Sequence, residues 1–513
     1  MTSIMERFSV LWLICNSLSV TSHQEALLQH SITVYPRLFE SRDNGSEKIL
    51  VVGAGYSLNL SEASVLAGSV LLRDLTDDGV VETYIAGKKH ERGLYQDSDK
   101  LASLLLKPQA EGEYHIIGLL NSTHEIQPVG ALERSSEGLI AHRILPIKTN
   151  AGINAAIKEA QNSYQEQVAS ARIAALSMSL PRNFTIELAF CSDYYHTIAF
   201  GNDTKARVQY VITMVLAVSL RLQQLSPPGF ISIALIQGSF IKNEPYVTTL
   251  NDTVLLGTET LRTLSKYASK NTKMRRADVV FLATGRTVAQ KEGHTVRFGT
   301  AGLAYLGSAC TNNKVGLATD APKSFSAVQS MTHEIAHLLN STHDGEGSSR
   351  NCDLSGGYLM HTHVGGRWHY LFSKCSIQAI RHFLTYVSST KISFCFQRAF
   401  FLRTTSAEKM CRTMRSLCLK VEERHHNIFL PGSFENLQNT TLEGQDYCKR
   451  FFPDYERVSY AGEKTQNNNC HVLCKIISRR YGTRYANLYA PTGTPCNKTL
   501  HESFKRCNFG LCE

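Results

Sequence analysis

Residues 333–344 read His-Glu-Ile-Ala-His-Leu-Leu-Asn-Ser-Thr-His-Asp, and this stretch constrains the fold more than any other part of the chain. Two histidines four residues apart lie one turn apart on a helix, so His333 and His337 can bind one ion. A catalytic zinc takes three protein ligands and leaves one position to water. The chain must therefore leave the helix near Asn340 and turn back, so that His343 becomes the third ligand.

The turn after this helix requires a residue that tolerates positive φ. Glycine does so best and asparagine is the next choice, so Asn340 suits the position. Glu334 is expected beside the metal, where its carboxylate can take a proton from zinc-bound water and pass it to the leaving amine. The alternative is a chance match, and the third histidine and the amphipathic phase of the helix argue against it.

Strand and helix patterns alternate before the metal-binding stretch. The helix Ser324–Leu339 is predicted to bury one apolar face and to carry His333 and His337 nearly opposite that face. Alternation of strands and helices predicts an α/β layer with a largely parallel sheet. The expected strands are Thr185–Phe190, Ile231–Gln237, Val279–Ala283, Leu303–Leu306 and Val315–Ala318, and the other expected helices are Lys205–Gln224 and Val254–Tyr267.

The N-terminal part of the chain differs in composition from the rest. Arg7 followed by the apolar run Phe8–Val20 predicts a secretory signal peptide over residues 1–22. Residues 23 to about 180 contain short alternating runs that predict a β-rich unit. Within it, residues 151–177 are rich in alanine, glutamine and serine, which indicates a linker or a loose helix. No later run reaches the roughly 18 apolar residues of a membrane-spanning helix.

Nine Asn-x-Ser/Thr sequons also fit an exported protein. They begin at Asn44, Asn59, Asn121, Asn183, Asn202, Asn251, Asn340, Asn439 and Asn497. The sequon at Asn340 is expected to be unused because it lies in the metal-binding turn.

Cysteine is concentrated at the C-terminal end. None occurs between residues 23 and 190, and eight follow residue 398. In an oxidising compartment such a dense, even set predicts a disulfide framework; zinc sites are the alternative, but paired CxxC units are absent. We therefore expect a signal peptide (1–22), an N-terminal domain (23–180), a zinc protease domain (181–398) and a cysteine-rich domain (399–513).

The formal net charge of +10 favours acidic partners. No nucleic-acid recognition motif accompanies the charge, so nucleic acid is not an expected partner. The C-terminal segment, residues 396–513, is itself basic. Its charge is either a solvated surface or a docking site for acidic glycans or cell-surface proteins.

The metal-binding stretch resembles that of the metzincins and, within them, the reprolysin (adamalysin) family of zinc proteases. Asn340 stands where the family pattern has glycine, and Asp344 is typical of reprolysins, where it is structural. Met360 resembles the methionine of the Met-turn beneath the zinc, and Gly302–Gly307 resembles the strand that lines the cleft. The resemblance implies a mixed, mostly parallel five-stranded sheet whose free edge binds an extended substrate.

The overall plan is most similar to that of tick salivary reprolysins. It implies a secreted zymogen with a propeptide over residues 23–180 and a cysteine-rich module after the protease. The implied substrates are extracellular proteins, namely fibrin(ogen) or matrix proteins. The alternative is a catalytically weak binding protein that acts through its cysteine-rich tail on receptors or clotting factors.

Several residues beyond the metal ligands have expected roles. Without a cysteine in residues 23–190, a propeptide thiolate cannot bind the zinc. Any latency must therefore come from steric blocking of the site or from another zinc ligand. By resemblance we pair Cys310 with Cys395 and Cys352 with Cys375, which leaves Cys191 as a buried apolar residue.

Two further sets have open alternatives. Glu187 and Asp278 match family positions for a structural Ca²⁺ or are solvated carboxylates. His361, His363 and His369 are loop residues, or they shape the substrate pocket or bind a second metal.

Overall fold

The computed structural model describes residues 31–148 with short gaps, 153–157, 182–385 except residue 365, and short strands between residues 457 and 512. The chain divides into two compact units, Met1–Glu423 and Arg424–Glu513, and each is described by itself. The predicted signal peptide lies outside the described residues.

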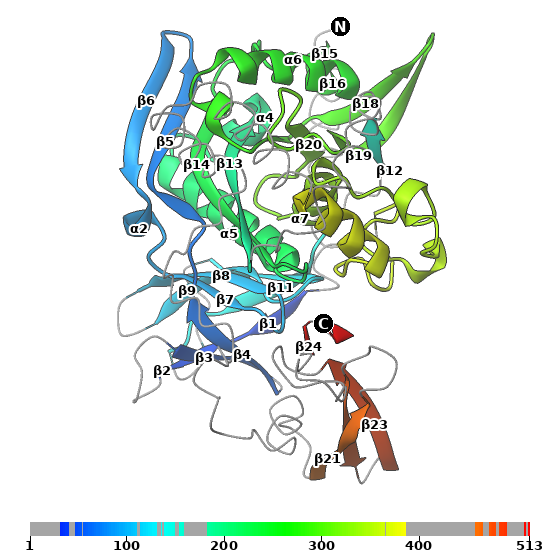
Figure 1. Ribbon diagram of the computed structural model, residues 1–513. Helices are drawn as coiled ribbons and strands as arrows, with labels where there is room; N and C mark the ends of the chain where they lie inside the picture. The colour runs from blue at the N-terminus through cyan, green and yellow to red at the C-terminus, as the bar shows by residue number, and fades with distance from the viewer. Residues whose placement is uncertain are drawn as a thin grey trace, which may run out of the picture. The chain divides into compact units, whose positions relative to one another are not determined.

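The centre of the first unit is a sheet of four parallel strands with an antiparallel fifth strand beside them (Figure 1). Their spatial order is β14 (Gly229–Ser239), β13 (Phe184–Ser192), β17 (Val279–Thr284), β20 (Val315–Thr319) and β19 (Thr295–Tyr305). Four of the five expected strands lie within them, and the fifth, Leu303–Leu306, extends one residue beyond the end of β19. Every residue of β17 is buried, as is usual for parallel strands covered on both faces. The predicted α/β layer is therefore confirmed.

The predicted five-stranded sheet is too small, because eleven strands of the described residues join this sheet. Strands from the N-terminal region pair with two of the five predicted strands, and further strands extend the sheet beyond β19. The added strands are β5 (Leu66–Thr76), β6 (Gly79–Ala86), β12 (Ile153–Ile157), β15 (Thr249–Asn251), β16 (Val254–Leu256) and β18 (Thr287–Glu292). An open strand edge carries unpaired N–H and C=O groups, and these strands satisfy them.

Two of the added strands join the N-terminal region to the predicted protease sheet. β5 pairs in parallel with β14, and β12 pairs in parallel with β19. The linker or loose helix expected from residue 151 onward is therefore wrong for Ile153–Ile157, which form a strand. Alanine-rich composition predicted helix there, but pairing with the edge of β19 decides the local structure.

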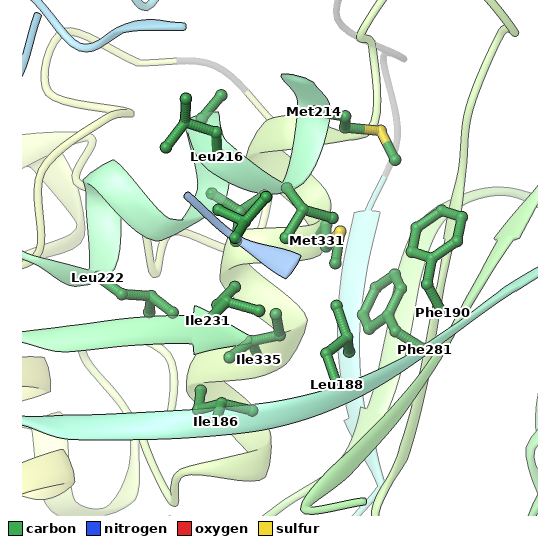
Figure 2. Packing of buried hydrophobic residues seen from close by; sticks show 14 of the residues in the cluster. Ile186, Leu188, Phe190, Met214, Leu216, Leu222, Ile231, Phe281, Met331 and Ile335 are labelled. Atoms are coloured by element: carbon green, nitrogen blue, oxygen red, sulfur yellow. The ribbon is translucent and has the colours of Figure 1, made fainter. Parts of the chain in front are cut away.

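The helices cover both faces of the sheet. They are α2 (Gly87–His90), α4 (Tyr194–Ile198), α5 (Thr204–Leu222), α6 (Gly257–Lys270) and α7 (Val328–Leu338). Because side chains alternate along a strand, β13 directs Ile186 and Leu188 into the core cluster that holds α5 and α7, and directs Ala189 into the cluster that holds α6. Figure 2 shows Met331 and Ile335 of α7 packed near Leu188 in the first of these clusters.

The metal-binding helix begins later than predicted, at Val328 rather than Ser324. Lys323 and Phe325 have φ values of 72° and 53°, which no helix allows. The helix also begins against a buried carboxylate, because the backbone N–H of Ala327 donates to Oδ1 of Asp320 at 2.9 Å. Asp320 follows β20, so the last parallel strand and the start of α7 are tied together.

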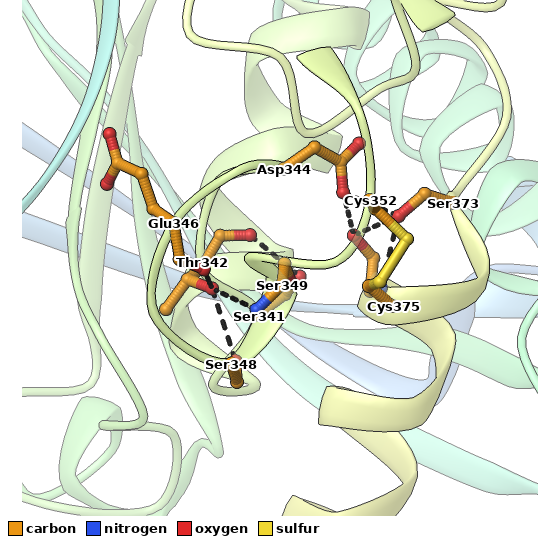
Figure 3. Close-up of a disulfide and its surroundings, with 10 residues drawn as sticks. Ser341, Thr342, Asp344, Glu346, Ser348, Ser349, Cys352, Ser373 and Cys375 are labelled. Atoms are coloured by element: carbon orange, nitrogen blue, oxygen red, sulfur yellow. Dashed lines mark hydrogen bonds between the residues drawn. A yellow bond between two sulfur atoms is a disulfide. The ribbon is translucent and has the colours of Figure 1, made fainter.

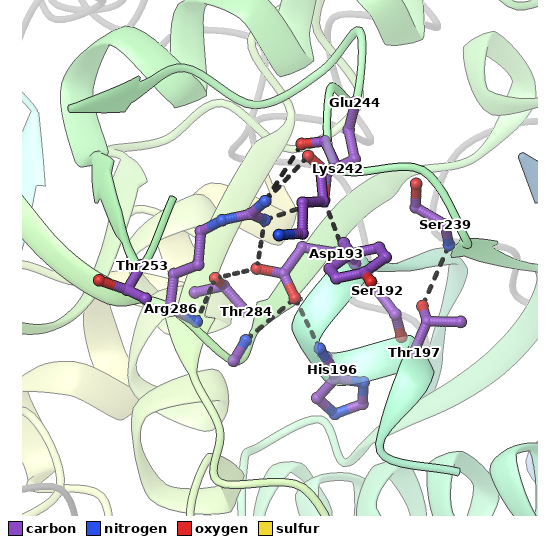
Figure 4. Close-up of polar contacts among 12 residues, drawn as sticks. Ser192, Asp193, His196, Thr197, Ser239, Lys242, Glu244, Thr253, Thr284 and Arg286 are labelled. Atoms are coloured by element: carbon purple, nitrogen blue, oxygen red, sulfur yellow. Dashed lines mark hydrogen bonds and ion pairs between the residues drawn. The ribbon is translucent and has the colours of Figure 1, made fainter. Parts of the chain in front are cut away.

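A cluster of buried charges fixes the carboxyl ends of β13 and β17 (Figure 4). Nη1 of Arg286 lies 2.9 Å from a carboxylate oxygen of Asp193 and 2.8 Å from one of Glu244. Asp193 also caps α4, because its Oδ1 accepts a hydrogen bond from the backbone N–H of His196. Buried charges are tolerated only when they are paired, and here each charge has its partner. The cluster therefore stabilises the fold and leaves no group free for chemistry.

The N-terminal region also forms a second, nine-stranded sheet in which every pairing is antiparallel. Its strands in spatial order are β1 (Ile32–Val34), β11 (His142–Pro146), β10 (His124–Pro128), β9 (Tyr114–Leu119), β8 (Ala102–Pro108), β7 (Leu94–Asp97), β4 (Tyr56–Glu62), β3 (Glu47–Gly53) and β2 (Arg37–Glu40). It has a core of its own, which includes Leu50, Leu58, Leu104 and Ile116. The β-rich character predicted for this region is therefore correct.

The second unit contains two small antiparallel sheets. One consists of β21 (Arg457–Lys464), β22 (His471–Ser478) and β23 (Gly482–Tyr489), and the other of β24 (Cys507–Asn508) and β25 (Leu511–Cys512). Most of the predicted disulfide framework of this tail falls on residues outside the described ones and stays a prediction. In the part of the chain that the structure describes, no helix is long and apolar enough to cross a membrane.

Candidate metal centre

Three imidazole rings converge at the C-terminal half of α7. Nε2 of His333 lies 2.9 Å from Nε2 of His337, which in turn lies 3.2 Å from Nε2 of His343. Nitrogens bound to one tetrahedral zinc at 2.0–2.1 Å are about 3.3 Å apart. Among the described residues, these three form the one His/Cys/Asp/Glu group with metal-binding geometry. The spacing of the sequence motif therefore corresponds to a site in space.

The other ring nitrogen of each helical histidine is held by a backbone carbonyl. Nδ1 of His333 lies 2.8 Å from the carbonyl oxygen of Leu359, and Nδ1 of His337 lies 2.7 Å from that of Ser341. A carbonyl only accepts, so both Nδ1 atoms carry the hydrogen and both Nε2 atoms present a lone pair. The rings are thereby oriented for a cation before any cation binds.

Burial keeps these imidazoles uncharged. Burial, followed by repulsion from His343, lowers the pKa of His333 to about 3. Burial, followed by repulsion from His333 and His343, places the pKa of His337 well below its usual value. A protonated imidazole cannot bind a metal, so both residues are available as ligands at neutral pH.

The turn that brings in His343 is a helix C-cap of Schellman type. Asn340 has φ of 72°, as the sequence predicted. Its N–H donates to the carbonyl of His337 at 2.8 Å, and the N–H of Ser341 donates to that of Ala336 at 2.9 Å. These two bonds satisfy the last carbonyls of α7 and reverse the chain direction. His343 is therefore delivered by a standard cap with asparagine in place of glycine.

Glu334 is completely buried on the same turn of α7. Neither of its carboxylate oxygens has a hydrogen-bond partner among the described residues, and burial raises its pKa well above the usual value. An orphaned buried carboxylate beside three imidazole lone pairs fits a site that holds a metal ion and its water. The space around it depends on Gly302 of β19, where an added Cβ would lie 2.7 Å from Oε1 of Glu334.

Beneath the histidines, Met360 is fully buried in the core cluster that also contains α7. Its carbonyl accepts a hydrogen bond from the N–H of Asp344 at 3.1 Å. Asp344 in turn accepts a hydrogen bond from the Ser373 hydroxyl at 2.6 Å. Residues 374–385, which come next, are helical, as the resemblance implied for this segment. Asp344 thus ties the metal-binding turn to the segment after it and plays a structural part.

The loop that carries Met360 is closed by the disulfide between Cys352 and Cys375, which confirms that pairing (Figure 3). Cys310 is also disulfide-bonded, but its expected partner Cys395 lies outside the described residues. Cys191 is free and fully buried, as predicted, and burial raises the pKa of its thiol to about 12. Such a thiol is almost wholly protonated and therefore unreactive at neutral pH.

The edge of β19 is not free, contrary to the expectation from the resemblance. β12 pairs along it in parallel, with Asn154 opposite Gly302 and Ile157 opposite Tyr305. The sequence motif of the edge strand is present, but its main-chain groups are already bound by another part of the chain.

The remaining predicted residues are not members of the imidazole cluster. His361 and His363 lie in the loop after Met360 with their rings 5.7 Å apart, and His363 is exposed. Neither they nor His369 belongs to a group with metal-binding geometry among the described residues. Glu187 and Asp278 adjoin each other, since the N–H of Glu187 donates to the Asp278 carboxylate at 2.9 Å. Calcium binding there stays a prediction.

A family profile described as Metallo-peptidase family M12 matches residues 181–383, which include α7, the three histidines and Met360. The chain contains an M12 metallopeptidase domain. Members of this family use zinc, so the protein is a zinc metalloendopeptidase, and the resemblance to reprolysins is confirmed. The similarity of its plan to tick salivary proteins stays a prediction.

Relatives of the M12 domain come from arthropods. A venom metalloproteinase, antarease TserMP_A of Tityus serrulatus, is 27% identical over an alignment of 338 residues. The alignment covers 57% of this chain and 78% of the relative. Venom metalloproteinase BumaMPs1 of Olivierus martensii is 25% identical over 64% of this chain and 84% of its own. A Bombyx mori protein named "A disintegrin and metalloproteinase with thrombospondin motifs like" is 28% identical over 60% of this chain and 47% of its own length.

Sequence reasoning missed two features of this region. The carbonyls of Leu359 and Ser341 orient the rings, but a backbone carbonyl has no signature in the sequence. Asn154, far from the motif along the chain, comes opposite Gly302 only through the pairing of β12 with β19. No signal short of the fold could have identified either.

Proposed function

We propose that this M12 protein is a secreted endopeptidase that hydrolyses peptide bonds of extracellular proteins. His333, His337 and His343 hold the zinc, and Glu334 is the catalytic base. The observation that carries the proposal is the convergence of three Nε2 atoms beside a buried carboxylate without a hydrogen-bond partner. Zinc supplies an acidified water and polarises the substrate carbonyl when it is bound.

The chain's own residues supply the proton transfers. The Glu334 carboxylate accepts a proton from the attacking water and returns it to the nitrogen of the leaving amine. The carboxylate can make both transfers because neither of its oxygens has a hydrogen-bond partner among the described residues. Gly302 keeps the space beside the carboxylate clear of any side chain.

Four finer statements complete the proposal. The substrates are fibrin(ogen) or matrix proteins, which the resemblance to reprolysins supports. The basic tail binds acidic glycans or cell-surface proteins by charge. A structural calcium binds at Glu187 and Asp278. The arrangement of segments is that of a zymogen, with residues 23–180 as propeptide and residues 399–513 as cysteine-rich domain.

The test uses full-length protein purified from a secretory host, with its N-terminus sequenced before and after limited proteolysis. Processed protein should digest fibrinogen or gelatin, lose that activity to 1,10-phenanthroline and regain it with zinc. Glu334→Ala should lower the rate by about 10²–10⁴-fold while metal analysis still finds zinc. Glu292→Gln, in an exposed ion pair on β18, is the matched control and should keep full activity.

The rival function, a binding protein that uses the protease fold as a scaffold, predicts the opposite result. Processed and folded wild-type protein would then bind zinc and hydrolyse nothing. That outcome would overturn the proposed activity, and hydrolysis retained by Glu334→Ala would remove the glutamate from the mechanism.

A further inference from the structure

The strand β12 occupies the position along β19 at which a protease of this type would take an extended substrate (Figure 1). A peptide that adds to a sheet edge binds through its main-chain N–H and C=O groups, so two strands cannot use the same edge at once. Here the N–H of Leu306 at the end of β19 donates to the carbonyl of Ile157 at 3.2 Å. A substrate strand would have to displace this segment first.

β12 is held from its other side as well. The N–H of Asn154 donates to the carbonyl of Thr362 at 3.0 Å, and Thr362 lies two residues beyond Met360. The segment therefore bridges β19 and the loop after the buried methionine. At its far end Ile157 packs against the core cluster that includes Leu303 and Tyr305 of β19. Main-chain and side-chain contacts together fix the register of the segment.

Asn154 lies on the face of the sheet that faces Glu334. It stands opposite Gly302, and register partners on neighbouring strands project their side chains from the same face of the sheet. On that face, a Cβ at Gly302 would lie against Glu334. The helix α7 is also in contact with β12. Ile157, three residues on, projects from the opposite face, as its contacts with the other cluster require.

The carboxamide of Asn154 has no hydrogen-bond partner within the described part of the chain. The side chain is 1% exposed, and neither Oδ1 nor Nδ2 is bonded. A buried amide without partners costs free energy, so its presence here needs a reason. The same is true of the two Glu334 oxygens on the same face of the sheet. Both orphaned groups are explained if they meet at the metal ion and its water.

We propose that Ile153–Ile157 is a built-in inhibitory strand, which binds the edge of β19 and places the Asn154 carboxamide against the metal centre. The segment supplies the latency that a cysteine cannot supply, because residues 23–190 contain none. Catalysis then requires the segment to leave the edge of β19. This inference rests on the proposed function for its biological meaning, but its structural content can be tested without hydrolysis.

The first test measures the strand pairing in Glu334→Ala protein, so that hydrolysis plays no part. Ala155→Pro puts a residue without an N–H in the middle of β12, and Ala151→Pro, two positions before the strand, is its control. Hydrogen exchange of the Leu306 amide should be at least tenfold faster in Ala155→Pro than in the control. Equal exchange in both variants, with both melting cooperatively, would overturn the inhibitory strand.

The second test addresses Asn154. Asn154→Ala keeps the backbone, so it should fold and load zinc as the wild type does. A chelator should then remove the zinc at least fivefold faster from Asn154→Ala than from wild-type protein. Asn312→Ala, at an exposed asparagine, is the control and should release zinc at the wild-type rate. Unchanged release from Asn154→Ala would show that its carboxamide does not reach the metal centre.

A third measurement separates this inference from the proposed function. In unprocessed protein that carries Glu334, Ala155→Pro and Asn154→Ala should each hydrolyse a peptide substrate at least tenfold faster than Ala151→Pro. If no variant hydrolyses anything while the Leu306 amide is deprotected as expected, the proposed protease activity fails and the pairing of β12 stands. If all variants hydrolyse at the same rate, the inhibitory role fails and the protease activity stands.

Discussion

The φ angle of one residue, Asn340, decides whether the chain can turn after α7 and bring His343 to the other two histidines. Asn340 lies at the left-handed position of a Schellman cap, and the cap is what carries the chain from α7 to His343. A β-branched residue is strongly disfavoured there, whereas glycine is not. The same asparagine packs closely on the loop that follows β19, because a Cβ on Gly307 would lie 2.8 Å from its Oδ1.

We therefore expect opposite results from two substitutions at Asn340. Asn340→Gly should keep chelator-sensitive hydrolysis and zinc content, because glycine adopts positive φ without strain. Asn340→Val should abolish hydrolysis and lower the stability by about 1–2 kcal/mol or more. Activity assays, metal analysis and thermal unfolding of the three proteins decide the matter. Equal activity in all three would show that the angle is not what the site requires.

At this scale the local part of the site was predictable and the distant part was not. The three histidines, Glu334 and the positive φ of Asn340 follow from helix geometry over a few residues. The ring-orienting carbonyls and Asn154 come from segments that the fold brings together. Sequence spacing carries no information about them because sheet register, and not chain distance, sets which residues meet.

Among the elements, α7 depends on what precedes it as much as on its own sequence. Asp320 accepts four hydrogen bonds: from the Ser326 hydroxyl at 3.0 Å, the Ala327 N–H at 2.9 Å, the Tyr210 hydroxyl at 2.7 Å and Nε2 of His196 at 3.0 Å. This carboxylate joins β20, α5 and the start of α7. It holds the metal-binding helix in place on the sheet.

Replacing Asp320 should therefore be costly. Asp320→Ala leaves several buried donors without an acceptor and should destabilise the first unit by about 3 kcal/mol or more. Asp252→Ala is the control, since that carboxylate is 76% exposed and forms its ion pair with the exposed Lys242, and should change stability by about 0.5 kcal/mol at most. Urea unfolding measures both. A loss below about 1 kcal/mol for Asp320→Ala would contradict its anchoring role.

The disulfide between Cys352 and Cys375 gives a second prediction for an element. It closes a loop with a sequence separation of 23, and this loop includes Met360. The double change of both cysteines to serine should cost about 3 kcal/mol through the entropy of the unfolded chain. Calorimetry of this variant beside the oxidised wild-type protein measures the loss. An unchanged melting temperature would mean that the packing of Met360 alone holds the loop.

The type and bounds of an element were predictable only where its local structure does not depend on distant partners. Four of the five strands and the helix α5 appear within a few residues of their predicted bounds, because apolar runs bounded by turn residues mark them. The strand β19 begins at Thr295, eight residues before the predicted start at Leu303. The start of α6 was placed three residues early, since Val254–Leu256 pair with β18 as a strand. The strand β12 was missed because its alanines favour helix and only the edge of β19 makes them extended.

For the first unit as a whole, stability should depend on pH through His142 in the N-terminal sheet. Its Nε2 accepts a hydrogen bond from the N–H of Ile116 at 2.9 Å, which requires the neutral ring. Burial lowers the pKa of His142 to about 4 from 6.5. The unfolded chain therefore binds a proton below pH 6.5 that the folded chain rejects until about pH 4.

The stabilising effect of the neutral His142 ring is present above pH 6.5 and is lost as the pH falls toward 4. At pH 5.5 the loss should be about 1.4 kcal/mol relative to neutral pH. His142→Gln should remove this component, so the difference in unfolding free energy between wild type and variant should shrink as the solution is acidified. A difference that stays constant between pH 7.5 and 4.5 would refute the assignment. Comparison with the variant cancels the titration of every other group.

If residues 23–180 are a propeptide, as proposed, the pairing of β5 affects the order of events during its removal. This strand is hydrogen-bonded in parallel along β14, in the same sheet as the metal-binding half of the molecule. Scission of the chain between the two halves therefore does not separate them: a nicked protein should stay intact on a sizing column until β5 is pulled away. Maturation should show a lag between cutting and full activity. Once β5 has been removed, β14 becomes an unpaired edge strand, and two copies of the enzyme can pair along it.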